Sequence, residues 1–132
     1  MLIVDDSTNL RQVIRRYISA SFDFQLFEAQ NGEEAEQILQ EGNAMGEPIQ
    51  IIMLDWMMPK VSGFEFLKKI RSTIAFEKDP RIIMLTAETY SEQINACMEY
   101  GVSSYVTKPF TQEDLAAALN KVIAEWGGQH AV

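Results

Sequence analysis

The sequence predicts an α/β fold: a doubly wound parallel sheet of five strands with helices on both faces. Two patterns predict it. Short apolar runs of strand length alternate with stretches in which apolar residues recur every three or four positions, as on one face of a helix. Four of the apolar runs also end at polar side chains, and ligands bind at the carboxyl ends of the strands in open α/β sheets. At 132 residues and 47% hydrophobic composition, the chain suits one domain with a substantial core.

The first strand is expected at Leu2 to Val4, after which Ser7 caps a helix. The apolar residues of that helix follow helical spacing: Leu10, Val13, Ile14, Tyr17 and Ile18. Phe24 to Glu28 is predicted as the second strand. The Asn-Gly pair at 31–32 is typical of a hairpin, but Glu33, Glu34 and Ala35 follow it, so a loop that opens a second helix is favoured.

A long polar loop with two glycines is expected from Glu41 to Pro48. The strand from Ile49 to Leu54 is the most apolar of the chain, which indicates a central position with both faces buried. Gly63 precedes the third helix, and Arg81 to Leu85 is predicted as the fourth strand. The third helix presents an apolar face made of Phe64, Leu67, Ile70 and Ile74.

Ser91 to Tyr100 is predicted as the fourth helix, ending at Gly101, a residue type that commonly terminates helices. The fifth strand follows at Ser103 to Thr107. Thr111 then has the position of an N-cap, with Asp114 in the acidic position of a capping box three residues later. The apolar stripe of the last helix consists of Leu115, Leu119, Val122, Ile123 and Trp126.

Composition and charge count against several classes of protein. A net charge of −8 and a pI of about 4.6 would repel a nucleic-acid backbone, so direct nucleic-acid binding is not expected. The apolar runs are too short to span a membrane, and an acid follows Met1 too early for a signal peptide; with Cys97 as the single cysteine, this favours the cytoplasm. The single histidine, His130, lies in the tail, which counts against serine-histidine and cysteine-histidine catalysis. We expect one domain over 1–132, with a core at 1–126 and a short tail at 127–132.

The polar ends of the predicted strands point to a phosphoryl-transfer site. They are Asp5–Asp6, Asp55, Thr86 and Lys108, in that order along the chain. In a parallel sheet these ends share one edge. Three carboxylates placed together repel one another unless a cation compensates, and Mg²⁺ binds through carboxylates, waters and phosphate oxygens. A carboxylate can accept a phosphoryl group as a nucleophile, while the ammonium and the hydroxyl can neutralise and hydrogen-bond the phosphoryl oxygens.

This constellation resembles the receiver domain of bacterial response regulators, and the likeness covers nearly the whole chain. The matching residues are Asp5–Asp6; Asp55, Met58, Pro59, Gly63 and Leu67; Thr86–Ala87; and Tyr105 with Lys108–Pro109–Phe110. The resemblance implies the flavodoxin-like strand order 2-1-3-4-5, for which a receiver protein is a standard example. It also implies a phospho-accepting regulatory domain, which is not an enzyme in the ordinary sense.

The resemblance implies Asp55 as the phosphoacceptor and Mg²⁺ as the cofactor. The metal would be bound by Asp6, Asp55 and the backbone carbonyl of Met57, with Asp5 contributing through water. Met57 would also flank the approach of water together with Glu88, so these two residues would modulate the lifetime of the phosphoryl group.

The remaining site residues would contact the phosphoryl group or respond to it. Thr86, Ala87 and Lys108 would be its contacts. Thr86 would move toward the phosphate and Tyr105 would rotate inward behind it, so these two would form the switch. The bond between Lys108 and Pro109 would be cis, a rare state of the peptide bond.

The implied phosphoryl donor is a phosphohistidine on a sensor histidine kinase or a phosphotransfer protein. The implied output surface combines the helix at Ser91 to Tyr100, the strand at Ser103 to Thr107 and the helix at Thr111 to Trp126. The stretches at 55–56 and 86–88 particularly resemble chemotaxis-type receivers, whose phosphorylated form binds a flagellar motor switch. A downstream protein of that kind is therefore the expected target, with no insertion into a membrane.

Other functions compete with this interpretation. Within the class, the chain could be a phosphorelay intermediate or a receiver cut from a larger regulator. A phosphohydrolase with Asp55 as nucleophile usually has a second acid two residues later, where this chain has Met57. A flavodoxin-like cofactor binder needs a phosphate loop with glycine after the first strand. Ser7–Thr8–Asn9 contains none, and the acid pair before it would repel the phosphate.

Overall fold

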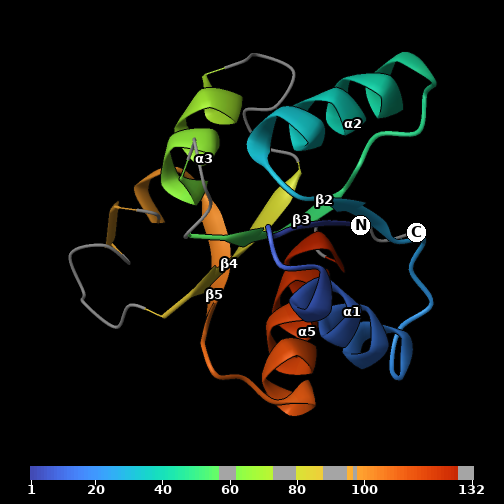
Figure 1. The fold of residues 1–132 in the computed structure, drawn as a ribbon, viewed down its shortest axis with the longest axis vertical. Coiled ribbons are helices and arrows are strands. Elements are labelled where there is room, and N and C mark those ends of the chain that lie inside the picture. Colours follow the sequence, from blue (N-terminus) through green and yellow to red (C-terminus); the bar gives the residue numbers. More distant parts are fainter. Residues whose placement is uncertain (57–61, 73–79, 88–94, 97, 128–132) are drawn as a thin grey trace.

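A computed structural model of the chain describes residues 1–56, 62–72, 80–87, 95–96 and 98–127. Its centre is a sheet of five parallel strands in the order β2-β1-β3-β4-β5, which confirms the predicted fold and strand order. The strands are β1 (Leu2–Val4), β2 (Phe27–Ala29), β3 (Ile51–Asp55), β4 (Arg81–Thr86) and β5 (Val102–Thr107). In Figure 1 the sheet runs through the middle of the molecule, with helices on both faces.

Four helices are assigned in the described part: α1 (Thr8–Ser19), α2 (Gly32–Ala44), α3 (Gly63–Arg71) and α5 (Gln112–Gly127). Figure 1 places α1 and α5 on one face of the sheet and α2 and α3 on the other. The predicted fourth helix begins in residues outside the described ones; the residues described there, 95–96 and 98–99, are helical. None of the helices in the described ranges has the length and apolar character that crossing a membrane requires.

Alternation along the strands divides the core into two layers. In β3, Ile52 and Leu54 pack with α2 and α3, whereas Ile51 and Met53 pack with α1 and α5. All five residues of β3 are buried, as expected for a central strand covered on both faces. Each such aliphatic side chain contributes about 1.5–3 kcal/mol on burial, so the two layers hold the sheet rigidly beneath its polar edge.

The second strand is shorter than predicted. The expected span was Phe24 to Glu28, but the strand begins at Phe27, which pairs with Leu2. Phe24 instead stacks on Phe22, with ring centroids 5.3 Å apart, and packs against the core layer under α1 and α5. Phe24 and Leu26 are partly buried against this layer, and only the last part of the predicted span pairs with β1.

The predicted loop from Glu41 to Pro48 is also wrong in its first half, because α2 continues to Ala44. The amide of Gly46 donates to the carbonyl of Asn43, and that of Glu47 to the carbonyl of Gly42. Gly46 has φ of 76°, the left-handed conformation that this type of helix end requires. The helix therefore stops at the second glycine of the segment and passes through the first.

Helix starts agree with the predicted caps. The Ser7 hydroxyl accepts from the amide of Leu10 at the start of α1. At α5 the Thr111 hydroxyl accepts from the Asp114 amide at 3.1 Å, and the Asp114 carboxylate accepts from the Thr111 amide at 2.9 Å, a complete capping box. These caps fix where the loops after β1 and β5 end, and both loops border the sheet edge discussed below.

Candidate functional site

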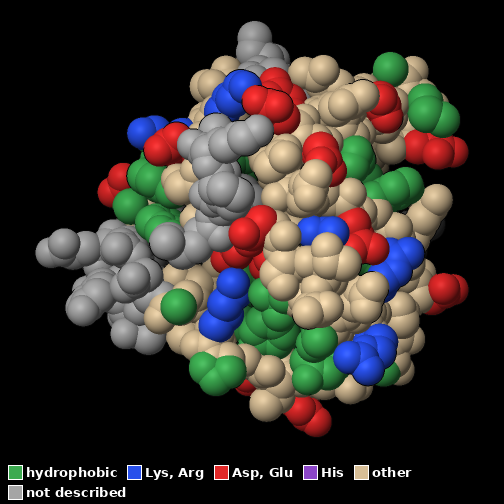
Figure 2. All heavy atoms as spheres, viewed as in Figure 1, with side chains coloured by type: hydrophobic (Ala, Val, Ile, Leu, Met, Phe, Trp, Pro, Cys, Tyr) green, Lys and Arg blue, Asp and Glu red, His purple; other side chains and the backbone are tan. Residues whose placement is uncertain are grey.

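The polar residues predicted at strand ends lie at one edge of the sheet. Asp5 directly follows β1, Asp55 and Thr86 are the last residues of β3 and β4, and Lys108 follows β5. The strand register places these ends side by side, since Val4 pairs with Leu54 and Asp55 with Leu85. Figure 2 shows acidic side chains next to a basic one near the middle of this face, over the ends of the strands in Figure 1.

Three carboxylates form the acidic part of the site. One oxygen from each of Asp5, Asp6 and Asp55 lies within 4.8 Å of the others. Asp5 is only 1% exposed and Asp55 3%, while Asp6 is exposed to solvent. Two buried acids and one exposed acid thus form a cluster that reaches the protein surface at Asp6.

Lys108 supplies the positive charge of the site. Its ammonium nitrogen lies 2.9 Å from Oδ1 of Asp55 and 3.8 Å from Oδ2 of Asp5. Its amide donates to the carbonyl of Thr86 at 2.8 Å, which fixes the start of the loop after β5 against β4. The following peptide bond, between Lys108 and Pro109, is cis.

The environment of Asp5 disfavours its charge. The pKa of Asp5 is raised to about 6, mainly by burial and in smaller part by the negative charge of Asp55, while the Ser7 amide and Lys108 act in the opposite direction. The Ser7 amide donates to Oδ1 at 2.8 Å. Oδ2 is buried and accepts no hydrogen bond in the described part of the molecule. A buried carboxylate oxygen without a donor, next to two other acids, has the chemistry of a ligand for a hard cation.

Comparison with known proteins identifies the family. The sequence model of the family described as response regulator receiver domain matches residues 1–120. The chain belongs to this receiver family. It is 32% identical to a chemotaxis protein CheY homolog of Campylobacter jejuni, over 99% of this chain and 97% of that protein. It is 34% identical to the chemotaxis protein CheY1 of Helicobacter pylori, over 93% of this chain and 95% of that protein.

Solved structures agree with the sequence comparisons. The chemotaxis protein CheY4 of Vibrio cholerae superposes on this receiver with a TM-score of 0.78 at 31% identity. The match covers 92% of this chain and 95% of that one. The receiver is thus similar to chemotaxis proteins along nearly its whole length.

The remaining predicted site residues differ in burial, and two of them lie outside the described residues. Thr86 is buried at the end of β4, and Ala87 beside it is exposed. Tyr105 lies on β5 and is 45% exposed. Met57 and Glu88, predicted as a metal ligand and as neighbours of the water path, lie outside the described residues.

The reason for a glycine at position 63 lies in the close packing of α3 and could not be predicted from the sequence. A Cβ atom at that position would lie 2.1 Å from the carbonyl oxygen of Asp55 and 3.0 Å from Cα of Trp56. The Gly63 amide donates to the carbonyl of Trp56 at 2.9 Å, and Ser62 caps α3 through the Glu65 amide. The start of α3 is therefore packed directly against the backbone of the predicted phosphoacceptor.

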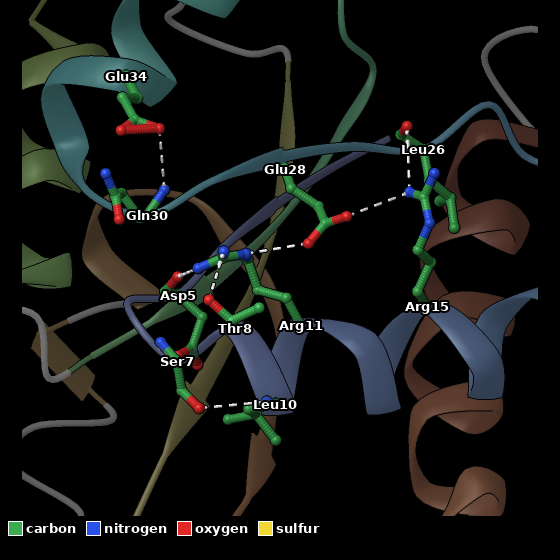
Figure 3. Close-up of polar contacts among 10 residues, drawn as sticks. All are labelled: Asp5, Ser7, Thr8, Leu10, Arg11, Arg15, Leu26, Glu28, Gln30 and Glu34. Carbon is green, nitrogen blue, oxygen red and sulfur yellow. Dashed lines mark hydrogen bonds and ion pairs between the residues drawn. The ribbon is translucent and has the colours of Figure 1, made fainter.

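Arg11 was missed altogether. In Figure 3 it extends from α1 between the loop that carries Asp5 and the β2 residue Glu28. Its guanidinium donates to the carbonyl oxygen of Asp5 at 2.6 Å. The sequence signal was weak, because an arginine in the first turns of an amphipathic helix is usually a solvated charge.

Proposed function

We propose that this receiver is a phospho-accepting signalling switch in which Asp55 takes a phosphoryl group from a phosphohistidine. The donor would be a sensor histidine kinase or a phosphotransfer protein in the cytoplasm, with the whole chain acting as one receiver unit. The observation that carries the proposal is the buried Asp55 carboxylate, 2.9 Å from the ammonium of Lys108 and in one cluster with Asp5 and Asp6. A nucleophile, a cation-binding acid pair and a phosphoryl counter-charge thus lie together.

The residues present fit Mg²⁺. Three carboxylates and one ammonium leave two negative charges at the sheet edge, which one divalent cation neutralises. Asp6 and Asp55 would hold the ion, with Asp5 acting through water; the backbone carbonyl of Met57, which lies outside the described residues, would complete the set. Bound there, the ion supplies positive charge to the phosphoryl oxygens during transfer.

In the proposed transfer, the phosphoryl group passes from the donor imidazole to the Asp55 carboxylate. An oxygen of the Asp55 carboxylate forms a bond to phosphorus while the bond from phosphorus to the donor imidazole nitrogen breaks. The electron pair of that bond returns to the imidazole, which takes a proton from water and leaves neutral. Lys108 exchanges its contact with Asp55 for one with a phosphoryl oxygen, and the hydroxyl of Thr86 donates to another. The product is an aspartyl phosphate.

The added charge would bias a two-state equilibrium of the receiver toward an output conformation. We assign the output to β5, α5 and the segment predicted as a helix before Gly101. A surface hollow of about 460 Å³ lies there between β5 and α5, bordered by Tyr105, Pro109 and Lys121. Because the relatives are chemotaxis proteins, we propose a downstream protein of the chemotaxis pathway as the target, with a flagellar motor switch as the specific candidate.

The residue that accepts the phosphoryl group can be identified by chemical trapping. The protein is treated with acetyl phosphate and Mg²⁺, and borohydride then reduces the acyl phosphate, converting the modified aspartate to homoserine. Peptide mass spectrometry is expected to find homoserine at Asp55 and unmodified Asp5 and Asp6. Homoserine at Asp5 or Asp6, or at no aspartate, would contradict the proposed function.

A further inference from the structure

Three polar atoms of Asp5 form hydrogen bonds to residues that have no part in the site proposed above. Its amide donates to the carbonyl of Ala29 at 3.1 Å, and its Oδ1 accepts from the Ser7 amide at 2.8 Å. Its carbonyl oxygen accepts from Nη1 of Arg11 at 2.6 Å. The fourth atom, Oδ2, remains a buried acceptor that faces Lys108 at 3.8 Å. The position of this oxygen therefore depends on how well the other three atoms are fixed.

Arg11 is itself fixed from three sides. Besides the Asp5 carbonyl, its Nε donates to Oε1 of Glu28 on β2 at 3.0 Å and its Nη2 donates to the hydroxyl of Thr8 at 3.1 Å (Figure 3). Its side chain is only 12% exposed. Because the guanidinium is planar and its donors point in fixed directions, three acceptors from three parts of the chain define its place. An exposed charge that served only solubility would have no such set of partners.

The contact reaches a second acid through the backbone. The carbonyl of Asp5 and the amide nitrogen of Asp6 belong to one planar peptide unit. Holding that carbonyl orients the plane from which the chain continues into Asp6. The exposed Asp6 carboxylate has no hydrogen bond or ion pair of its own within the described residues, so its direction is set mainly by its backbone. Arg11 thus acts on two of the three acids without touching their carboxylates.

We propose that Arg11 is a positioning residue of the cation site, which fixes the peptide between Asp5 and Asp6 so that both carboxylates converge with Asp55. The inference rests on the proposed function, because it takes the three acids to be a Mg²⁺ site. It adds a residue outside the acid cluster, and Glu28 as the anchor that orients that residue from β2.

Loss of the Arg11 charge and loss of its hydrogen bond to the Asp5 carbonyl would change the Mg²⁺ affinity in opposite directions. A guanidinium close to a cation site repels the cation, so removing its charge alone would strengthen Mg²⁺ binding or leave it unchanged. Loss of the hydrogen bond to the Asp5 carbonyl would weaken Mg²⁺ binding instead. Arg11→Met keeps most of the aliphatic part of the side chain and removes the charge and the donors. Arg11→Lys keeps the charge and removes the planar arrangement of several donors.

Arg15 offers a matched control on the same helix. It also pairs with Glu28, at 3.6 Å, and donates to the carbonyl of Leu26, but the structure describes no contact between it and the Asp5 loop. Arg15→Met changes the net charge by the same amount as Arg11→Met. A difference between the two variants therefore reports the contact with Asp5 and excludes a general effect of charge.

The test is calorimetric titration of Mg²⁺ into the wild type and the three variants, together with amide hydrogen exchange at Ser7 in metal-free protein. The dissociation constant is expected to rise about tenfold in Arg11→Met, about threefold in Arg11→Lys, and less than about twofold in Arg15→Met. The Ser7 amide, which donates to Asp5, is expected to exchange faster in both Arg11 variants and at the wild-type rate in Arg15→Met. If Arg11→Met does not fold, Arg11→Lys carries the test.

Mg²⁺ binding by both Arg11 variants that is as tight as in the wild type, or tighter, would overturn the positioning role and leave the proposed function standing. Equal weakening in Arg15→Met would also overturn it, because the effect would then not depend on the Asp5 contact. A wild-type protein that binds no Mg²⁺ would overturn the proposed function, and the inference with it.

Discussion

The ammonium of Lys108 lies 2.9 Å from Oδ1 of Asp55, although the two residues are 53 positions apart in the sequence. The contact joins the ends of β3 and β5, which are not neighbours in the sheet, across the end of β4. The amide of Lys108 is held by Thr86 at the end of that intervening strand. The charge pair at the centre of the site is therefore a consequence of parallel strands ending at one edge.

Replacing Lys108 by methionine tests the role of this pair. The ammonium competes with a cation for the same carboxylates, so Mg²⁺ binding to Lys108→Met is expected to become several-fold tighter. The rate of phosphorylation by acetyl phosphate is nevertheless expected to fall about 100-fold, because a charge that stabilises the transferred phosphoryl group is lost. Calorimetry and intact-mass time courses measure the two effects. Lys121→Met, an equal charge change at an exposed position of α5, is the control; an unchanged phosphorylation rate in Lys108→Met would refute the role.

The raised pKa of Asp5 predicts how stability depends on pH in the absence of metal. With a pKa of about 6 in the folded state, mainly because of burial, Asp5 binds its proton more tightly when the protein is folded. Its contribution to stability is thus full at low pH and is lost as the pH rises through about 6. Between pH 5 and pH 7 in the presence of EDTA, Asp5 is expected to lower the free energy of unfolding by about 1 kcal/mol.

Urea unfolding of wild type and Asp5→Asn at the two pH values isolates this contribution. Other groups titrate in both proteins, so the quantity of interest is the difference between the two pH dependences. The wild type is expected to lose more stability than Asp5→Asn as the pH rises from 5 to 7. Identical losses in the two proteins would mean that Asp5 has an ordinary pKa in the folded state.

Gly63→Ala is expected to disturb the site without changing any of its side chains. The added methyl would meet the Asp55 carbonyl at 2.1 Å, and a backbone atom yields far less easily than a flexible side chain. We expect the free energy of unfolding to fall by about 3 kcal/mol. Gly32→Ala is the control, since the nearest neighbours of its methyl would be side-chain atoms of Phe66, the closest at 3.2 Å. Equal stability of the two variants in urea unfolding would contradict the close packing at Gly63.

Thr86→Ala is expected to separate phosphorylation from output. The hydroxyl is not needed for Asp55 to accept a phosphoryl group, so the modified fraction should remain close to that of the wild type. The Tyr105 ring resonances, which we expect to shift on phosphorylation of the wild type, should stay at their unmodified positions. A normal shift of Tyr105 in phosphorylated Thr86→Ala would show that the switch does not run through this hydroxyl.

The fold class, and the meeting of the strand-end residues at one sheet edge, were predictable because these signals are local, whereas the strand order was implied by the resemblance to the receiver family. Apolar runs that stop at Asp5, Asp55 and Thr86 define where the strands end. Because the strands are parallel, these ends lie at the same edge of the sheet. The helix starts were predictable for the same reason, since a cap such as Thr111 depends on residues a few positions away.

What the sequence did not reveal depends on contacts between distant segments. The part of the predicted strand from Phe24 to Glu28 that pairs with β1 could not be identified from the sequence, because Phe24 and Leu26 are partly buried against the core without belonging to β2. The need for Gly63 follows from how closely α3 packs on Asp55, and the place of Arg11 follows from acceptors on α1, on β2 and in the loop between β1 and α1. The loop from Glu41 was mispredicted because one of its glycines lies within a helix.

Intact-mass measurement with acetyl phosphate shows whether Asp55 is a Mg²⁺-dependent phosphoacceptor. Wild type and Asp55→Asn are incubated with and without Mg²⁺. The wild type is expected to gain one phosphoryl group only when Mg²⁺ is present, and this group should be stable in acid and lost in base; Asp55→Asn is expected to gain none. An equal gain in Asp55→Asn, or a gain in the wild type that does not depend on Mg²⁺, would refute this role of Asp55.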